Sequence, residues 1–366
     1  MALQCGIIGL ANVGKTTLFN CMSKTKAETS AFAFSSNKSN LGLIEVPDAR
    51  LGELAKLVNP AKVTHATVEI VDIPGLTKGS STGEGVGNKF LADIRTCDAL
   101  IHVLRCFDNP SLPHIEGSVN PVRDMETVEF ELQVKDLESI EKKLQKVEKA
   151  AKLANDKDAR KALEVLQLYK QHIEEFKPAR TAAVSEDDKK YIADLFLLSA
   201  KPVMYVCNVD DKSALNGNAY VDKVKEALKG KEETVLVLAA EIESEIAELD
   251  SADDRKVFLE ELGLHEPGVN KLVRAAYDLL NLMSFFTEGT DEVRAWTIRK
   301  GMLAPQAARA IHTDLERGFI RAEVMKYDDF IKLGSEPACK AAGKFYVEGK
   351  NYLVQEGDIM HIRFNV

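Results

Sequence analysis

The stretch that decides the fold is CGIIGLANVGKTTLFN, residues 5–20, in which an apolar run precedes the pattern G-x-x-x-x-G-K-T. Gly9 and Gly14 permit a loop whose backbone N–H groups surround a β-phosphate, where a side chain would intrude. Lys15 supplies a positive charge to the phosphates, and Thr16 supplies a hydroxyl for Mg²⁺. Strand, loop and helix start follow one another here, so the sequence predicts a nucleoside triphosphate site. Its predicted contacts are Asn12, Val13, Gly14, Lys15, Thr16 and Thr17.

A second motif, Asp72-Ile73-Pro74-Gly75, follows another apolar run about 60 residues later. An aspartate at a strand end lies beside the nucleotide-bound metal, and Gly75 can turn its N–H towards a γ-phosphate. We therefore predict Thr16 and Asp72 on the metal, and Lys15 and Gly75 in catalysis. The glycine-rich segment 79–87 is predicted to order around the γ-phosphate, although a flexible loop without a switching role is the alternative.

The composition is that of an ordinary globular chain, with 45% hydrophobic and 29% charged residues among 366. The chain has no run of about 18 apolar residues and no basic leader, so neither a membrane span nor a signal peptide is predicted. The six cysteines are scattered without a C-x-x-C pair, which favours buried thiols in a reducing cytosol. A formal charge of −9 argues against a general nucleic-acid-binding surface. We therefore expect a cytoplasmic protein that does not use a membrane.

Apolar β-rich runs alternate with helical patterns over residues 1–124 and again from about 200 to 283. Such runs are typical of parallel strands covered on both faces. We therefore predict a doubly wound α/β sheet of the P-loop NTPase type over residues 1–283. Residues 284–366 change to short alternating strands, ending with Tyr352–Gln355, around one helix-like segment, which predicts a small α+β domain.

Residues 125–200 interrupt this pattern with two apolar stripes on either side of the polar break NDKDARK. Their helical spacing predicts an antiparallel helical hairpin, a coiled coil. From Glu141 to Lys161, eight basic and four acidic residues give a local charge of +4. A basic tip fits a contact surface for RNA or another partner, whereas a solvated insertion that only lengthens the domain is the alternative. The stripes contain Leu137, Ile140, Leu144, Val147 and Ala151, then Leu163, Leu166, Tyr169, Ile173 and Phe176; the tip contains Lys149, Lys152, Lys157, Arg160 and Lys161.

Several segments together resemble the YchF / Obg-like ATPase family, over essentially the whole chain. They are GLANVGKTTLFN, VDIPGL with GEGVGNKFLADIR, HVLRCF, AAEIESEIAEL, EVRAWT, and IHTDLERGFIRAEV closing on GDIMHIRFNV. The resemblance implies a cytosolic P-loop ATPase of the Obg group that hydrolyses ATP with Mg²⁺. It implies an OBG-type domain over 1–283, interrupted by the hairpin at 125–200, and a ubiquitin-like β-grasp (TGS) domain over 284–366. It further implies binding to the 50S ribosomal subunit and the 70S ribosome, as a regulatory switch in translation or stress.

The base-recognition loop is YVCNVDD, residues 205–211, where guanine-specific switch proteins carry Asn-Lys-x-Asp. Val209 stands in place of that lysine and removes its packing against the base. The resemblance implies an Asn-x-x-Glu motif with a preference for ATP, so Asn208 and Val209 would face adenine. Asp211 departs from that motif, and its carboxylate at the guanine-reading position leaves GTP binding open. We therefore predict ATP over GTP, with Ala240 as a backbone contact to the base edge.

Three further positions concern hydrolysis. Leu76 stands where many GTPases place a water-orienting glutamine, and a leucine cannot polarise water. The resemblance implies that His114, in PSLPHIEG, acts on the nucleophilic water, whereas a lone loop histidine is otherwise a surface residue. The segment FAFSSNKSN (32–40) resembles the family's first switch only loosely, since residues 37–39 depart from it. Ser36 falls at its threonine position, and we predict it as a third metal ligand.

Three functions therefore remain open from the sequence. The first is a ribosome-associated ATPase, and the second is a GTP-driven switch of the same fold. The third is an RNA or ribosome-binding adaptor with weak nucleotide turnover, which the basic tip and the TGS-like domain favour. The intact Lys15, Thr16 and Asp72 argue against this adaptor.

Overall fold

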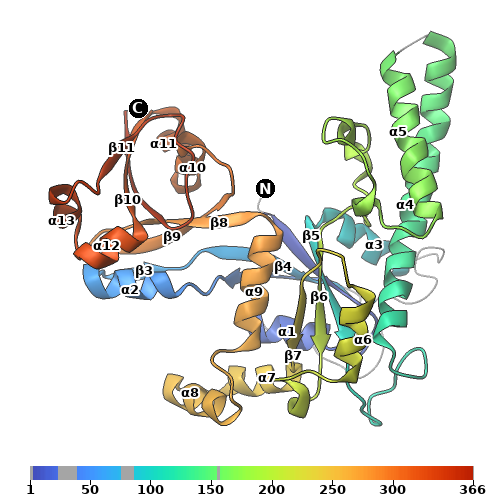
Figure 1. Cartoon of the computed structure of the whole chain (residues 1–366), viewed down its shortest axis with the longest axis horizontal. Coiled ribbons are helices and arrows are strands. Elements are labelled where there is room, and N and C mark those ends of the chain that lie inside the picture. Colours follow the sequence, from blue (N-terminus) through green and yellow to red (C-terminus); the bar gives the residue numbers. More distant parts are fainter. Residues whose placement is uncertain (1–2, 24–38, 76–85, 155–156, 366) are drawn as a thin grey trace. The chain divides into compact units, whose positions relative to one another are not determined.

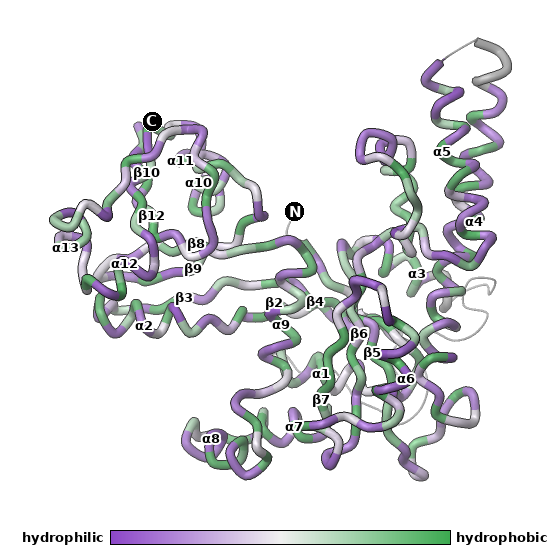
Figure 2. Tube along the Cα trace, in the orientation of Figure 1, coloured by the Kyte–Doolittle hydropathy of each residue, from purple (hydrophilic) through white to green (hydrophobic). Residues whose placement is uncertain are grey.

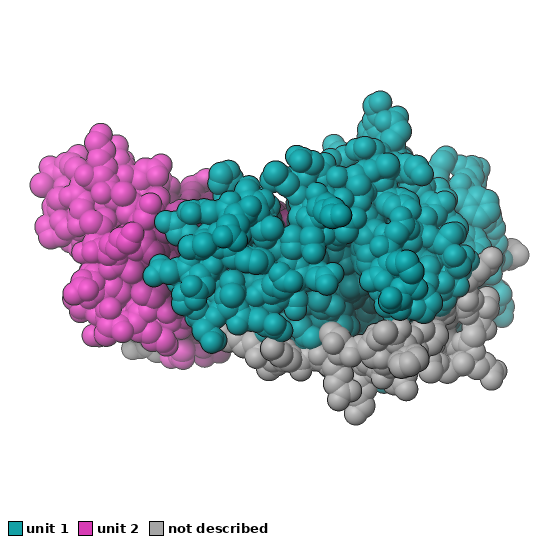
Figure 3. Space-filling view, turned by 90° about the horizontal axis from the view of Figure 1, so that it is seen from below, with its two compact units in different colours: residues 1–42, 69–272 teal, residues 43–68, 273–366 magenta. Residues whose placement is uncertain are grey.

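The computed structural model describes residues 3–23, 39–75, 86–154 and 157–365. These residues form two compact units (Figure 3). The first unit contains residues 1–42 and 69–272, and the second contains 43–68 and 273–366. The units differ from the predicted division at 283/284, because residues 43–68 lie in the predicted nucleotide-binding domain but pack with the C-terminal part of the chain.

A six-stranded sheet in the order β2-β4-β1-β5-β6-β7 forms the centre of the first unit (Figure 1). The pairs β4–β1, β1–β5, β5–β6 and β6–β7 are parallel. Every residue of β5 and β6 is buried, because helices cover both faces of their apolar runs (Figure 2). The chain leaves β1 to one side and later continues on the other, which confirms the doubly wound fold and places ligands at the carboxyl end of β1. The strands are β1 (Gln4–Ile8), β2 (Asn40–Glu45), β4 (Thr67–Asp72), β5 (Ala99–Arg105), β6 (Val203–Asn208) and β7 (Val235–Leu238).

Helices connect these strands, as the alternating pattern predicted. The side chain of Asn218 caps the helix after β6 by accepting hydrogen bonds from two backbone N–H groups. Glu243 accepts from the N–H groups of Gly268 and Val269 at 2.6 and 3.2 Å, and thereby begins the last helix of the unit. The helices are α1 (Lys15–Met22), α3 (Val86–Thr96), α6 (Ala219–Ala227), α7 (Ala240–Glu248), α8 (Ala252–Glu261) and α9 (Gly268–Leu279), with a 3₁₀ turn, η4 (Asp211–Ser213).

The inserted segment is an antiparallel helical hairpin, as predicted (Figure 1). Its helices α4 (Pro121–Ala154) and α5 (Lys157–Glu174) bury the two apolar stripes against each other, with Ile140, Leu166 and Tyr169 at the centre. Phe176 was predicted to continue the stripe, but α5 ends at Glu174 and Phe176 is 74% exposed with φ +60°. Within the described part of the tip, the side chains of Lys149, Lys157, Arg160 and Lys161 are exposed; that of Lys152 lies outside it.

A return segment leads from α5 back to β6 through three 3₁₀ turns, η1 (Ala179–Thr181), η2 (Asp188–Tyr191) and η3 (Ala193–Leu195). The fully buried carboxylate of Asp136 on α4 holds its end by accepting hydrogen bonds from Leu198 N–H, Ser199 N–H and the Ser199 hydroxyl, each at 2.7 Å. Burial raises the pKa of Asp136 to about 6. These contacts attach the hairpin to the sheet.

The second unit is built on another six-stranded sheet, in the order β11-β10-β12-β8-β9-β3. Antiparallel β8 and β9 form a hairpin, α10 follows, and β12 returns parallel to β8, which is the predicted β-grasp arrangement. Phe285, Ala307 and Met360 lie in the core between this sheet and α10. The strands are β3 (Lys62–Thr64), β8 (Leu282–Thr287), β9 (Glu292–Arg299), β10 (Phe319–Lys326), β11 (Tyr346–Glu348) and β12 (Asp358–Phe364); the helices are α2 (Ala49–Val58), α10 (Ala304–Ile311), α11 (Thr313–Arg317), α12 (Tyr327–Leu333) and α13 (Glu336–Ala341).

Two local predictions in this unit were wrong. Residues 352–355 were predicted as a strand, but they make only an isolated bridge from Leu353 to Leu303. The helical pattern before this unit was predicted to continue to about residue 283, whereas residues 282–287 form the strand β8. This strand is buried on both faces, and periodicity alone does not distinguish its short continuous apolar run from the end of a buried helix.

Candidate nucleotide-binding site

The loop between β1 and α1 has an unusual backbone. A Cβ on Gly9, where φ is +146°, would lie 2.5 Å from the carbonyl oxygen of Val103. A Cβ on Gly14, where φ is +97°, would lie 2.4 Å from Asn208 Nδ2. Asn12 has φ +62°, a left-handed conformation that asparagine tolerates. The loop therefore requires its two glycines, and it ends at the N-terminus of α1, where free N–H groups favour an anion.

Lys15 is the first residue of α1, and it is only 6% exposed. Its ammonium group donates to the Leu10 carbonyl oxygen within the loop at 2.6 Å. Burial lowers the pKa of Lys15 to about 8, while the negative charge of Asp72 acts in the opposite direction. An anion in the loop would stabilise the charged amine that burial disfavours.

Thr16 and Asp72 meet beside this amine, as the two motifs predicted. The Thr16 hydroxyl donates to Asp72 Oδ2 at 2.8 Å. Asp72 is 4% exposed, and within the described part of the chain its Oδ1 is buried without a hydrogen bond. Burial raises the pKa of Asp72, against the hydrogen bond from Thr16, the charge of Lys15 and a weaker interaction with the Asn40 side chain. A hydroxyl and a carboxylate with an unpaired oxygen are a donor set that suits Mg²⁺.

Gly75 lies directly against the phosphate loop. A Cβ at this position would lie 2.8 Å from the backbone nitrogen of Ala11 and 2.9 Å from its Cα. Only glycine therefore permits this approach of the segment after β4 to the loop after β1. The predicted switch residues Ser36 and Leu76, and the segment 79–85, lie outside the described residues.

Asn208 holds the loop from the opposite side. Its Nδ2 donates to the Val13 carbonyl oxygen at 2.9 Å, and its Oδ1 accepts from the backbone N–H of Ala240 at 2.9 Å. Asn208 is 3% exposed, so these bonds are shielded from water. The side chain thus bridges the phosphate loop and the start of α7. The sequence placed Asn208 and Ala240 at the nucleotide, but it did not reveal this bridge between them.

The loop that carries His114 also contacts the phosphate loop. Asn12 Nδ2 donates to the Pro113 carbonyl oxygen at 3.2 Å. The His114 ring is 4% exposed; its Nδ1 accepts from the Glu116 N–H at 3.1 Å, so Nε2 carries the proton that Asp124 Oδ2 accepts at 2.9 Å. His114 is therefore not the bare surface histidine that its sequence context alone suggested, and both its ring nitrogens have partners.

Arg105 is a buried residue that the sequence analysis missed. It ends β5, is 2% exposed, and donates to the carbonyl oxygens of Phe107, Asn109 and Leu112 at 2.9–3.2 Å. Burial lowers the pKa of this guanidinium, although Asp108 and Asp124 oppose the change. Arg105 thus shapes the loop that leads to His114. In the sequence, the only indication of this role was an arginine at the end of a continuous apolar run.

Comparisons with known proteins agree with this geometry. Residues 4–209 match the MMR_HSR1 family, described as "50S ribosome-binding GTPase", and residues 282–365 match YchF-GTPase_C, described as "Protein of unknown function (DUF933)". A Bacillus subtilis (strain 168) protein named "Ribosome-binding ATPase YchF" is 47% identical over 368 residues, which cover 100% of each chain. Its namesake from Escherichia coli O157:H7 is 45% identical over 366 residues, again 100% of each chain. The chain belongs to the YchF family.

A solved structure of the family supports the same conclusion about the fold. The Schizosaccharomyces pombe YchF GTPase superposes with a TM-score of 0.87 at 34% identity, and covers 99% of this chain and 97% of its own. The names within the YchF family differ on the nucleotide, since this protein is called a GTPase and the bacterial relatives are called ATPases. Among the described residues, no helix is long and apolar enough to cross a bilayer.

The base loop of this YchF family member differs from a guanine-specific one in its burial. Val209 is 3% exposed, and its N–H donates to the Leu238 carbonyl oxygen at 3.0 Å, so it packs into the fold. Asp211 begins η4 and is exposed. A carboxylate is thus accessible at the position that reads guanine, while the lysine that would cover the base is replaced by a buried valine.

Proposed function

We propose that the chain is a magnesium-dependent nucleoside triphosphatase that prefers ATP to GTP and acts at the ribosome. The observation that carries this proposal is the pair of buried charged residues Lys15 and Asp72, joined by the half-buried Thr16 at the start of α1. Burying an amine and a carboxylate oxygen without full compensation costs free energy. A triphosphate and its metal would supply the missing partners to both groups.

Each residue of the group has a separate task in this proposal. Lys15 holds the β- and γ-phosphates by charge, and the N–H groups at the start of α1 and at Gly75 orient them. Thr16 and Asp72, joined by Ser36, hold the metal, which when bound neutralises charge on the phosphates during transfer. Asn12, Val13, Gly14 and Thr17 complete the phosphate contacts, because the loop wraps the same phosphate group.

His114 is proposed as the group that acts on the attacking water. Its loop is joined to the phosphate loop through the hydrogen bond from Asn12 to the Pro113 carbonyl oxygen, which supports this role. In this structure Nε2 is engaged by Asp124 and Nδ1 by the Glu116 N–H. Because Nε2 carries the proton that Asp124 accepts, His114 would accept the water's proton at Nδ1, and the Glu116 N–H contact must open for this when nucleotide binds.

The preference for ATP rests on Val209 and on the names of the bacterial relatives, while Asp211 keeps GTP as the competing substrate. Competitive titration of both nucleotides, with phosphate release measured in parallel, tests the proposal. We expect tighter binding of ATP, and an Asp211→Asn variant that loses residual GTP affinity without losing ATP. GTP binding ten times tighter than ATP binding, a difference of about 1.4 kcal/mol, would overturn the preference.

The 50S subunit and the 70S ribosome are proposed as partners, with the cytoplasm as the place of action. The exposed basic tip of the hairpin and the TGS domain are candidate contacts with ribosomal RNA. Sedimentation with purified ribosomes tests this, using Lys157→Glu and Arg160→Glu together, and Lys223→Glu with Lys225→Glu on α6 as the matched control. Only the tip variant should bind ribosomes more weakly, and its binding should depend less on salt than that of the wild type. No phosphate release above background at ribosome saturation would instead favour an adaptor.

A further inference from the structure

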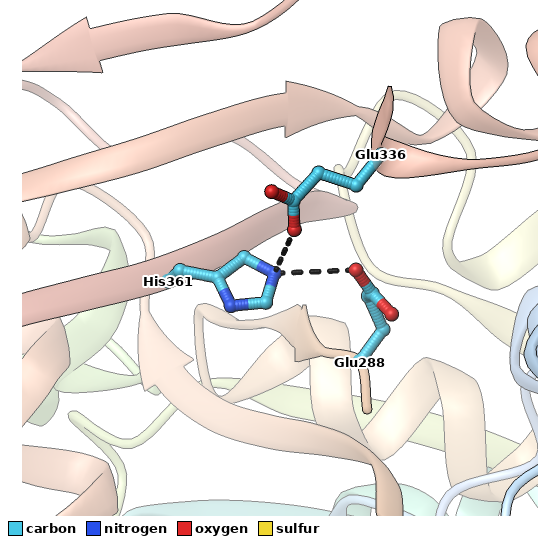
Figure 4. A group of neighbouring side chains, drawn as sticks. All are labelled: Glu288, Glu336 and His361. Carbon is cyan, nitrogen blue, oxygen red and sulfur yellow. Dashed lines mark hydrogen bonds and ion pairs between the residues drawn. The ribbon is translucent and has the colours of Figure 1, made fainter. Parts of the chain in front are cut away.

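Three side chains that no part of the nucleotide chemistry uses converge in the second unit (Figure 4). Glu288 directly follows β8, His361 lies in β12, and Glu336 is the first residue of α13. The parallel register pairs Ile359 with Phe286. Two residues further along each strand, Glu288 and His361 therefore share one face of the sheet, so backbone pairing itself brings them together.

The two distances from His361 to the glutamates are close to those between the ligand atoms of a metal site. His361 Nε2 lies 3.2 Å from Glu288 Oε1 and 3.6 Å from Glu336 Oε2, and the three atoms lie within 4.8 Å of one another. Tetrahedral zinc, with bonds of about 2.0–2.2 Å, separates its ligand atoms by about 3.3–3.6 Å. An ion could therefore enter between these atoms with little movement of the chain.

The surroundings favour a cation at this point. The side chains of Glu288, Glu336 and His361 are only 11%, 27% and 27% exposed, so their charges are poorly screened by water. His361 Nε2 faces both carboxylates, and Lys340 pairs with Glu336 from the next turn of α13.

We propose that Glu288, Glu336 and His361 bind one divalent transition-metal ion, preferably zinc, through His361 Nε2 and one oxygen of each glutamate. Water completes the coordination. The ion displaces the His361 proton and balances both carboxylate charges, and it ties α13 to strands β8 and β12. The site is structural and independent of the nucleotide.

Zinc titration of the full-length protein tests this proposal. The protein is stripped with a chelator, kept reduced so that its cysteines cannot oxidise, and titrated with zinc chloride against a chromogenic chelator. We expect one equivalent of bound zinc to be lost in His361→Gln and in Glu288→Gln. His312→Gln is the matched control, because His312 lies 3.5 Å from Asp314 in the same unit but has no second carboxylate.

Two further readouts separate metal binding from a purely structural ion pair. Zinc should raise the Tm of the wild-type protein and of His312→Gln, but not that of His361→Gln, once each variant is shown by circular dichroism to be folded. Zinc affinity should fall as pH is lowered, because proton and ion compete for Nε2. Equal zinc stoichiometry in wild type and His361→Gln, or an equivalent loss in His312→Gln, would overturn the proposal.

Discussion

Replacing Asn208 with alanine distinguishes two possible roles of this residue, which are positioning the phosphate loop and reading the base. The side chain joins the Val13 carbonyl oxygen to the Ala240 N–H, so each of its amide atoms already has a buried protein partner in this arrangement. We therefore expect Asn208 to position the phosphate loop, so that its loss weakens every nucleoside triphosphate alike. A residue that reads the base would instead discriminate between ATP and GTP.

The size of the effect follows from burial. Asn208→Ala leaves the Val13 carbonyl and the Ala240 N–H without their partner, at residues that are 1% and 5% exposed. Each unsatisfied buried group costs about 1–3 kcal/mol, so the free energy of unfolding should fall by about 2–6 kcal/mol. Water entering the vacated space moves the loss towards the lower figure. If about 1–3 kcal/mol of this also falls on the nucleotide complex, affinity drops about 5–150-fold.

Urea unfolding and calorimetric titration with ATP and GTP measure both quantities. Asn218→Ala is the matched control, since Asn218 also bridges backbone groups, donating to the Cys106 carbonyl oxygen at 2.8 Å and accepting from the Tyr220 N–H at 3.0 Å. It does not touch the phosphate loop, so this variant should lose stability but keep its nucleotide affinity. A drop for ATP alone in Asn208→Ala would refute positioning and assign Asn208 to the base.

Three further outcomes are expected. Burial holds the pKa of free Lys15 near 8, below the 10.5 of an unfolded lysine, so the stability of the nucleotide-free protein should rise as pH increases from about 8 to 10.5. Triphosphate restores that charge, and binding above pH 8 should take up a proton, seen as a buffer-dependent heat that Lys15→Met abolishes. Gly75→Ala should weaken nucleotide binding because its Cβ would strike Ala11, whereas Gly52→Ala, with nothing within 4 Å in an exposed helix, should stabilise by about 0.5–1 kcal/mol in urea unfolding. His114→Ala should lower phosphate release without weakening ATP binding, and unchanged turnover would remove His114 from the chemistry.

The parts of the fold that the sequence predicted are those specified locally. Near-continuous apolar runs identified β5 and β6, and helical periodicity identified α4 and α5, because burial on both faces or on one stripe imposes those patterns. The grouping of residues 43–68 with the C-terminal unit was not predictable in this way. It depends on β3 pairing in parallel with β9, more than 200 residues away, and no local pattern records such a partner.

In the candidate site, too, the features specified by local motifs were predicted and those that depend on distant contacts were not. The meeting of Thr16 with Asp72 was predicted because the two motifs are fixed to the ends of adjacent parallel strands. Arg105 and Asp124 were missed because their importance lies in what they contact. A charged residue beside a loop has the same sequence appearance whether it is solvated or binds three buried carbonyl groups, as Arg105 does.

The hydrogen bonds around His114 link the phosphate loop to the helical hairpin, and they bear on whether His114 is catalytic. Asn12 joins the phosphate loop to residue 113, and Asp124, in the first turn of α4, holds the neighbouring imidazole. The same bond therefore restrains the histidine and links the phosphate loop to the long helix whose tip is basic. Because Nε2 carries the proton that Asp124 accepts, a water-activating His114 would accept a proton at Nδ1 and must release the Glu116 N–H, whereas a purely positioning His114 keeps both bonds. The Glu116 N–H contact is thus the element that distinguishes a catalytic histidine from a structural one, and loss of phosphate release in His114→Ala has to be read together with the state of that contact.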